Sequence, residues 1–190
     1  MTRGLAGLGI PGAGVTPKPV RRIFLLRHAK SDWGDAGRED HDRDLSARGR
    51  DATGRMATYC RRAGIAPALI LCSTATRARE TLALVLPGLI PPGRVEYEDK
   101  LYLAEAERLL RRLQALDDDD PSVMVVGHNP GFHALAAALV GDGDPSDLQR
   151  LRQKFPTGAL AEIEAPIQRW RDLEAGENRL ARFIVPRELP

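Results

Sequence analysis

Residues 21–30 read RRIFLLRHAK, a short apolar run that ends in an arginine followed by a histidine. The run from Ile23 to Leu26 shows no alternation of polar and apolar side chains, so we expect both faces of this strand to be buried. Strands of this kind lie at the centre of parallel sheets that helices cover on both sides. Ligands of such sheets bind beyond the carboxyl ends of the strands. The sequence therefore predicts that Arg27 and His28 lie at a binding site.

Two later segments repeat this organisation. In residues 68–81, ALILCSTATRARET, Arg77 follows an apolar run, and in residues 122–131, SVMVVGHNPG, His128 follows another. Because the carboxyl ends of parallel strands meet at one edge of a sheet, we expect these residues to share a crevice with Arg27 and His28. His128 would also stand at the amino-terminal end of a helix, which favours anions.

The alternation of strand and helix patterns predicts one three-layer α/β/α domain with a mostly parallel sheet over residues 21–190. Ser46 is expected to cap a helix that ends before Gly64, Ser73 or Thr74 to open the helix that carries Arg77, and Asn129 to cap another. The predicted strands are residues 23–26, 68–72, 94–97, 122–126, 159–163 and 180–185, and the predicted helices are residues 47–63, 74–86, 104–116 and 130–140.

Composition narrows the class of protein. With 190 residues the chain can bury roughly 70% of its unfolded surface in one domain. Its net charge of +2 and its dispersed arginines argue against nucleic acid as a partner. The absence of a long apolar run argues against a membrane span, and the two cysteines indicate a reducing compartment, so a cytoplasmic enzyme is expected. Residues 1–20, with five Gly and three Pro, are interpreted as a flexible arm.

Four motifs in the same order and spacing carry a family resemblance: LRHAKSDW at residues 26–33, DRDLSARG at 42–49, the pattern S-x-x-x-R-A-x-E-T at 73–81, and GHNPG at 127–131. From about residue 21 to about residue 163 the chain resembles the histidine phosphatase superfamily, and most closely its small SixA-type branch of phosphohistidine phosphatases. The resemblance implies a phosphoglycerate mutase-like fold without an inserted cap. It departs from the family pattern at Asp44, where relatives usually have proline.

The resemblance assigns His28 as the nucleophile that is transiently phosphorylated, and Arg27, Arg77 and His128 as the phosphate pocket. The residue chemistry agrees with this assignment. Arginine donates paired hydrogen bonds to phosphoryl oxygens, and a neutral imidazole nitrogen in line with phosphorus can act as the nucleophile. Phosphoryl transfer needs mainly positioning and charge neutralisation, so no metal or other cofactor is expected.

The proton donor is not assigned by the sequence. A phosphohistidine depends less on acid catalysis than a phosphoester, because imidazole is a better leaving group than an alkoxide. Only about fifty residues separate Arg77 from His128, so we also expect an open site that admits a phosphorylated side chain of another protein, of the histidine phosphotransfer type, as in signal transduction. The candidate acids are Asp32, Asp42, Glu96, Glu98 and Asp99.

Several alternatives stay open or are disfavoured. The same fold could hydrolyse small phosphoesters or phosphosugars, or serve as a phosphate-binding or protein-binding module without catalysis. A cysteine phosphatase is disfavoured because only four residues separate Cys72 from Arg77.

The alternating Asp40, Asp42 and Asp44 do not fit a calcium loop and are expected to form ion pairs with Arg43. Residues 117–120, four aspartates, are interpreted as a solvated loop. The sequence does not indicate the oligomeric state.

Overall fold

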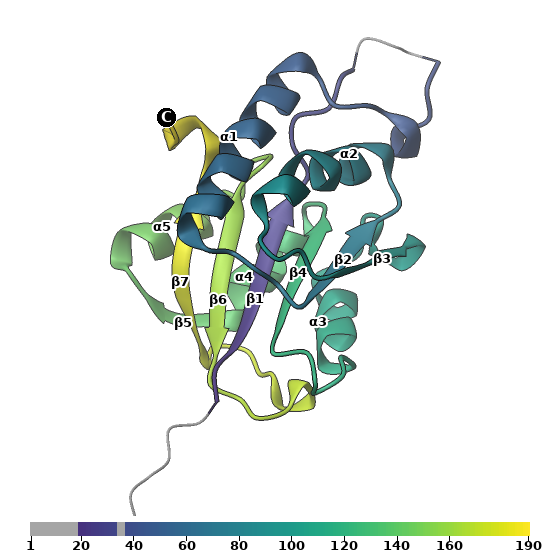
Figure 1. Cartoon of the computed structure of the whole chain (residues 1–190). Helices are drawn as coiled ribbons and strands as arrows, with labels where there is room; N and C mark the ends of the chain where they lie inside the picture. The colour runs from purple at the N-terminus through teal and green to yellow at the C-terminus, as the bar shows by residue number, and fades with distance from the viewer. Residues whose placement is uncertain (1–18, 34–36) are drawn as a thin grey trace, which may run out of the picture.

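The computed structural model describes residues 19–33 and 37–190. The predicted arm, residues 1–20, lies outside this part of the chain apart from its last two residues, so its boundary stays a prediction. In the described residues, strands and helices form a single α/β domain (Figure 1).

Seven strands of the described chain form one sheet in the order β3-β2-β4-β1-β6-β7-β5. β1 pairs in parallel with β4, β4 with β2, β2 with β3, and β7 with β5, whereas β6 runs antiparallel to both of its neighbours. The predicted α/β fold with a mostly parallel sheet is therefore confirmed. The strands are β1 (Arg21–Arg27), β2 (Leu69–Ser73), β3 (Arg94–Glu98), β4 (Ser122–Gly127), β5 (Val140–Gly143), β6 (Leu160–Ala165) and β7 (Asn178–Ile184).

Helices cover both faces of the sheet. α1 (Ala47–Ala63) and α2 (Thr76–Val85) lie on one face, and α3 (Ala106–Gln114), α4 (Gly131–Leu139) and α5 (Pro145–Gln153) lie on the other (Figure 1). Short 3₁₀ turns complete the described chain: η1 (Asp40–Asp42), η2 (Leu86–Gly88), η3 (Asp99–Leu101), η4 (Trp170–Asp172) and η5 (Pro186–Glu188). Between β3 and β4 the chain forms only η3 and α3, which leaves this end of the sheet without an inserted cap.

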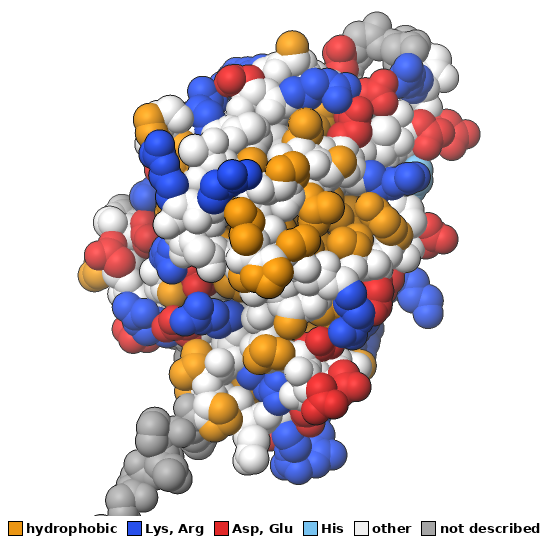
Figure 2. Space-filling view, viewed as in Figure 1, with side chains coloured by type: hydrophobic (Ala, Val, Ile, Leu, Met, Phe, Trp, Pro, Cys, Tyr) orange, Lys and Arg blue, Asp and Glu red, His pale blue; other side chains and the backbone are white. Residues whose placement is uncertain are grey.

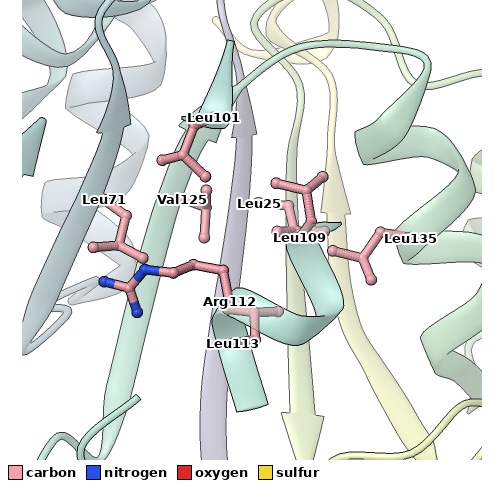
Figure 3. A pocket seen from close by; sticks show the side chains of 8 residues that line it. All are labelled: Leu25, Leu71, Leu101, Leu109, Arg112, Leu113, Val125 and Leu135. Carbon is pink, nitrogen blue, oxygen red and sulfur yellow. The ribbon is translucent and has the colours of Figure 1, made fainter. Parts of the chain in front are cut away.

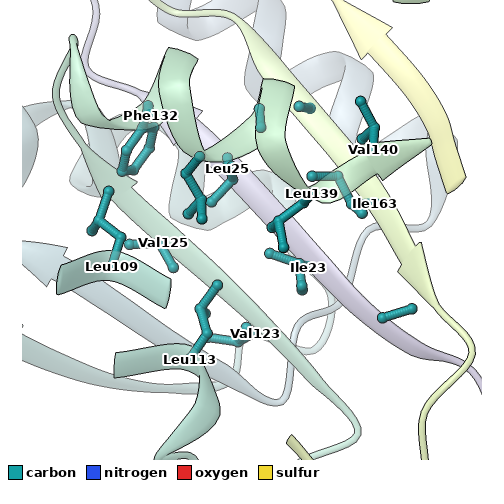
Figure 4. Packing of buried hydrophobic residues seen from close by; sticks show 14 of the residues in the cluster. Ile23, Leu25, Leu109, Leu113, Val123, Val125, Phe132, Leu139, Val140 and Ile163 are labelled. Atoms are coloured by element: carbon teal, nitrogen blue, oxygen red, sulfur yellow. The ribbon is translucent and has the colours of Figure 1, made fainter. Parts of the chain in front are cut away.

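The apolar side chains of β1 point alternately to the two sides of the sheet, as the pleat requires. Ile23 and Leu25 pack with Phe132 and Leu139 of α4 (Figure 4). Phe24 and Leu26 belong to a second cluster with residues of α1 and α2. The buried run at residues 23–26 is therefore apolar on both faces because helices cover both, as predicted.

Two of the predicted helix ends are confirmed. The Ser46 hydroxyl accepts a hydrogen bond from the Gly49 amide (3.1 Å), and Gly64 ends α1 with a left-handed backbone (φ 65°). The other two predicted caps are wrong. α2 begins after Ala75, and α4 begins after Pro130 without a side-chain cap. Asn129 instead donates its side-chain amide to a distant carbonyl, and this contact could not be read from the local sequence.

Two further corrections concern the polar segments. β5 and α5 were not predicted, although Asp144 caps α5 by accepting hydrogen bonds from the amides of Ser146 (2.9 Å) and Asp147 (3.2 Å). The run at residues 117–120 is not wholly solvated. Asp120 is buried, forms a bidentate ion pair with Arg94 and accepts the indole N–H of Trp170 (2.8 Å) on its carbonyl.

On the face that α1 and α2 cover, hydrophobic side chains gather in the middle and charged ones surround them (Figure 2). The exposed Leu84 and Ile90 are large hydrophobic residues of this region of the chain. Within residues 19–33 and 37–190, no helix combines the length and the apolar character that a membrane crossing requires.

Candidate active site

Four predicted residues meet at the carboxyl edge of the sheet. Arg27 ends β1 beside Gly127, the last residue of β4, so that His28 and His128 follow two neighbouring parallel strands. Arg77 lies in the first turn of α2, immediately after β2 and its connecting loop. The rings of His28 and His128 lie 5.0 Å apart, and each of the four residues is close enough to the other three to interact electrostatically. The predicted grouping is present in the structure.

His28 is held in one tautomer by the backbone of the next residue. Its Nδ1 atom lies 2.8 Å from the carbonyl oxygen of Ala29. Because a carbonyl oxygen can only accept a hydrogen bond, Nδ1 carries the proton and donates, and Nε2 keeps its lone pair. The His28 amide donates to the Gly127 carbonyl (3.0 Å), which fixes the residue to β4. Burial, together with the charges of Arg77 and Arg27, lowers the pKa of His28 to about 3. His28 is thus neutral at pH 7.

Arg27 is anchored through one end of its guanidinium group. Nη1 donates to the carbonyl oxygen of Phe155 (2.8 Å), and the same oxygen accepts from the side-chain amide of Asn129 (3.0 Å). The Gly158 amide donates to the carbonyl oxygens of both Arg27 and His28 (3.1 Å each). Residues of the loop that precedes β6 therefore hold the carboxyl-terminal end of β1 in place.

Arg77 is almost completely buried and is held by Asp40. Its Nη2 donates to the Asp40 carboxylate (2.8 Å), and its Nη1 donates to the Asp40 carbonyl oxygen. The Tyr102 hydroxyl donates to the same carboxylate (2.6 Å). The hydrogen bond from Tyr102 and the charge of Arg77 lower the pKa of Asp40, so this carboxylate is ionised at neutral pH.

His128 is paired on one side only. Its Nε2 lies 2.8 Å from the Ser73 hydroxyl, whereas its buried Nδ1 has no hydrogen-bond partner among the described residues. Burial and the neighbouring His28 and Arg77 lower the pKa of His128 to about 3, so it is neutral at pH 7. The edge of the Tyr102 ring packs against it at 5.4 Å between ring centroids.

The arrangement is suited to a multiply charged oxyanion. Besides His128 Nδ1, the Nε groups of Arg27 and Arg77 are buried without a partner in the described chain. The two Nε groups are donors, and His128 Nδ1 is a third when its Nε2 accepts from the Ser73 hydroxyl. Buried donors are normally paired, so these groups around His28 indicate a place for an acceptor. Arg77 is buried and Arg27 is half-buried. Asp40 pairs with Arg77, whereas Arg27 has no ion pair with a described carboxylate, which leaves a positive pocket. No three His, Cys, Asp or Glu side chains in residues 19–33 and 37–190 are grouped to hold a metal ion.

Asp40, Tyr102 and His41 belong to this site but were not predicted as site residues. Asp40 was considered only as a calcium ligand or an ion-pair partner, and no sequence pattern marks Tyr102. The His41 ring lies 4.9 Å from that of Tyr102, and its Nε2 lies 3.1 Å from the Thr74 hydroxyl. The only local signal was the polar composition of the loop that precedes Ser46.

Of the three ion pairs expected with Arg43, the structure shows one, and the other two carboxylates have different partners. Asp40 pairs with Arg43 (3.1 Å), Asp42 lies 3.0 Å from His41 Nδ1, and Asp44 pairs with Arg38. Asp42 and Asp44 thus contact residues of the loop, whereas Asp40 also contacts Arg77 and Tyr102 outside it.

The five candidate acids differ in their surroundings: three of them contact basic side chains, and the other two are exposed. Glu98 is bound by Arg112 (2.7 Å), Glu96 pairs with Arg94 (3.0 Å), and Asp42 contacts His41. Asp32 and Asp99 are exposed. The carboxylate that contacts the four-residue cluster is instead Asp40.

Cys72 and Cys60 are free and buried, and burial raises the pKa of each thiol to about 12. Cys72 therefore belongs to the core, as expected, and is a poor nucleophile at pH 7. The cytoplasmic location inferred from the cysteines stays a prediction.

An apolar hollow beneath α3 is not part of the site. It is lined by leucines, Val125 and the stem of Arg112, and it has no space for a water molecule (Figure 3). Its lining lies within the core rather than at the carboxyl edge of the sheet, and we interpret it as loose packing.

The fold is that of an α/β protein, and its predicted site residues surround a neutral histidine with donors that suit an oxyanion. A model of the histidine phosphatase superfamily, branch 1, matches residues 23–102. An uncharacterised protein of Mycobacterium tuberculosis is 38% identical over 164 residues, which cover 85% of this chain and 100% of that protein.

Two solved structures are similar over their whole length. They come from Nakamurella multipartitia and Agrobacterium tumefaciens, and both are provisionally assigned as the phosphohistidine phosphatase SixA. Each is 32% identical to this chain, with TM-scores of 0.76 and 0.73, and the match covers 90% of this chain and 99% and 100% of theirs. The chain belongs to the histidine phosphatase superfamily, in its SixA-type branch, and is a phosphatase.

Proposed function

We propose that this phosphatase removes the phosphoryl group from phosphohistidine side chains of other proteins, in signal transduction in the cytoplasm, through a covalent intermediate on His28. The observation that carries the proposal is the free Nε2 lone pair of a neutral His28 beside two arginines. Nε2 attacks phosphorus, the bond from phosphorus to the substrate nitrogen breaks, and the electron pair leaves with the substrate imidazole, which takes a proton. Water then attacks the phosphoryl group on His28, the bond from phosphorus to Nε2 breaks and returns its electron pair to the imidazole, and phosphate leaves with the oxygen of the water.

Arg27, Arg77 and His128 bind the phosphoryl oxygens in this mechanism. Their buried unpaired donors supply hydrogen bonds where negative charge develops, without reorganisation at the moment of transfer. Because the pocket is pre-formed and positive, the site needs no metal to neutralise this charge.

The state of Asp40 supports phosphohistidine over an ordinary phosphoester. An alkoxide leaving group needs a proton donor, and the carboxylate in contact with the cluster is held ionised by Tyr102 and Arg77. An imidazole leaving group has less need of this donor. The provisional assignment of the two solved relatives as phosphohistidine phosphatases also supports this substrate class.

The test is to trap the intermediate. Wild-type enzyme is mixed with a carrier protein labelled on phosphohistidine, or with a labelled simple phosphoester, and quenched in alkali, where phosphohistidine survives. We expect acid-labile label on wild-type enzyme with a faster burst from the phosphoprotein, and none on His28→Ala. His133→Ala is the matched control, because His133 packs against the Leu151 carbonyl (2.8 Å), outside the cluster. A fast burst from the phosphoester alone would refute the proposal.

A further inference from the structure

A groove of about 600 Å³ opens beside the candidate active site. Its walls come from the loop after β1, the first half of α1, the end of α5 with the following loop, and β7 with η5. Figure 1 shows the carboxyl-terminal end of the chain beside α1. Among the described residues, no Asp or Glu lines this groove. Besides Arg27, its cationic lining residues are Lys30, Arg48, Arg55, Arg150, Lys154 and Arg187.

Only part of this positive charge is neutralised. Three of the cations have carboxylate partners: Arg55 pairs with Asp51 (3.1 Å), Arg150 with Asp147 (2.9 Å) and with Glu188, and Arg187 lies 3.7 Å from Glu188.

The other three groove cations, Lys30, Arg48 and Lys154, are exposed and have no ion pair with a described residue. A concave surface with unpaired charge of one sign concentrates its field and attracts the opposite charge.

The groove and the candidate active site share Arg27. Its Nη1 is held by the carbonyl of Phe155, the residue before the groove-lining Pro156 and Thr157. The next residue, Gly158, donates its amide to the carbonyl of His28. A molecule whose phosphoryl group lies at His28 could therefore also contact the groove.

The spacing of the cations indicates the size of that molecule. Arg48 and Arg55 are seven residues apart on α1, which places their Cα atoms about 10 Å apart along the helix. The cations come from four separate parts of the fold, and Lys30, Arg48, Lys154 and Arg187 are exposed whereas Arg55 and Arg150 are half-buried. A compact oligophosphate would need convergent donors, whereas carboxylates spread over a protein surface match a distributed set.

We propose that this groove, lined by Lys30, Arg48 and Lys154, binds an acidic protein surface that surrounds the phosphorylated histidine of the substrate. The inference rests on the proposed function and adds the character of the partner. Exposed charge pairs between two proteins raise the rate at which the proteins meet and favour partners of complementary charge. Salt screens these pairs and therefore weakens their effect. The groove therefore acts on the KM for the protein substrate, while the chemical step stays with His28.

The test combines a triple variant with two substrates. Lys30→Glu, Arg48→Glu and Lys154→Glu are introduced together, and kcat and KM are measured with an acidic phosphohistidine carrier protein and with free phosphohistidine. Because the loss of each exposed pair costs a factor of about two and the reversed charges add repulsion, we expect kcat/KM for the carrier to fall at least about eightfold through KM. Activity on free phosphohistidine should stay unchanged, and the difference should shrink at high salt.

Arg62→Glu, Arg108→Glu and Arg171→Glu together form the matched control, because these arginines are exposed, lie outside the groove, and the change of charge is identical. A carrier protein whose acidic residues around the histidine are changed to Asn and Gln should be insensitive to the groove variant. Equal losses in both triple variants, or equal losses on both substrates, would overturn the inference. Wild-type enzyme inactive on any phosphoprotein would instead refute the proposed function itself.

Discussion

The Nδ1 atom of His28 donates its proton to the carbonyl oxygen of Ala29, the next residue in the chain, over 2.8 Å. In the proposed mechanism this local contact decides which nitrogen attacks phosphorus, because it leaves Nε2 unprotonated. Burial beside Arg77 and Arg27 then keeps the ring neutral far below its ordinary pKa. The backbone and the electrostatic surroundings together thus keep His28 in the state that the proposed mechanism requires of its nucleophile.

The lowered pKa values of His28 and His128 predict how stability depends on pH. Both are about 3 in the folded protein and 6.5 in the unfolded chain, so the unfolded state binds more protons between these values. The free energy of unfolding should fall as the pH falls from 6.5 towards 3, by about 1.4 kcal/mol per pH unit for each histidine. Above pH 6.5 neither residue contributes a slope.

Urea unfolding of wild type and of the double variant His28→Asn, His128→Asn between pH 4 and 8 measures this difference. The wild-type curve should be steeper below pH 6.5, and the two slopes should agree above it. Parallel curves over the whole range would show that the two histidines titrate normally in the folded protein.

Asp40 is predicted to orient Arg77. Asp40→Ala removes the carboxylate that holds Nη2, so the guanidinium is less well positioned and kcat/KM should fall about tenfold. Asp40→Asn keeps an oxygen acceptor and should stay within about threefold of wild type. Asp44→Ala is the control, since Asp44 lies in the same loop and pairs with Arg38 instead. If both alanine variants behave alike, Asp40 only supports the loop.

Whether a feature could be predicted depends on how local its physical cause is. The burial of residues 23–26 follows from their composition, and Ser46 and Gly64 mark the ends of α1 with contacts three or four residues away. Asp40 and Tyr102 meet across 62 residues of chain, and nothing in either segment indicates the other.

The wrong predictions have the same physical origin. Asn129 has the side chain of a good helix cap, but it forms a hydrogen bond with the Phe155 carbonyl, which also anchors Arg27. Asp120 lies in a run of four aspartates that appears fully solvated in sequence, yet its neighbours in space include Arg94 and Trp170. In contrast, Asp144 followed by Pro145 was a readable start of α5.

Cys72 is predicted to be dispensable for catalysis. Its thiol is buried, its pKa is raised to about 12, and it donates to the Ser73 carbonyl (3.3 Å), a contact that serine can also make. Cys72→Ser should therefore keep kcat within about twofold and lower the free energy of unfolding by about 1 kcal/mol, because a hydroxyl replaces a buried thiol. Steady-state kinetics and urea unfolding check both values. A folded variant without activity would point to a cysteine nucleophile.

Gly158 is predicted to affect activity because its backbone holds the end of β1, where Arg27 and His28 lie. It has a left-handed backbone (φ 74°), its amide holds the carbonyls of Arg27 and His28, and an added Cβ would lie 3.0 Å from Pro186. Gly176 has nearly the same φ (76°) but open space around it. Alanine at either position should cost about 1 kcal/mol of stability from the left-handed strain. Only Gly158→Ala should also lower kcat, because relief of its contact with Pro186 shifts the end of β1 and hence the Nε2 atom of His28. Matched losses of stability with unchanged kcat in both variants would show that the loop before β6 does not position the nucleophile.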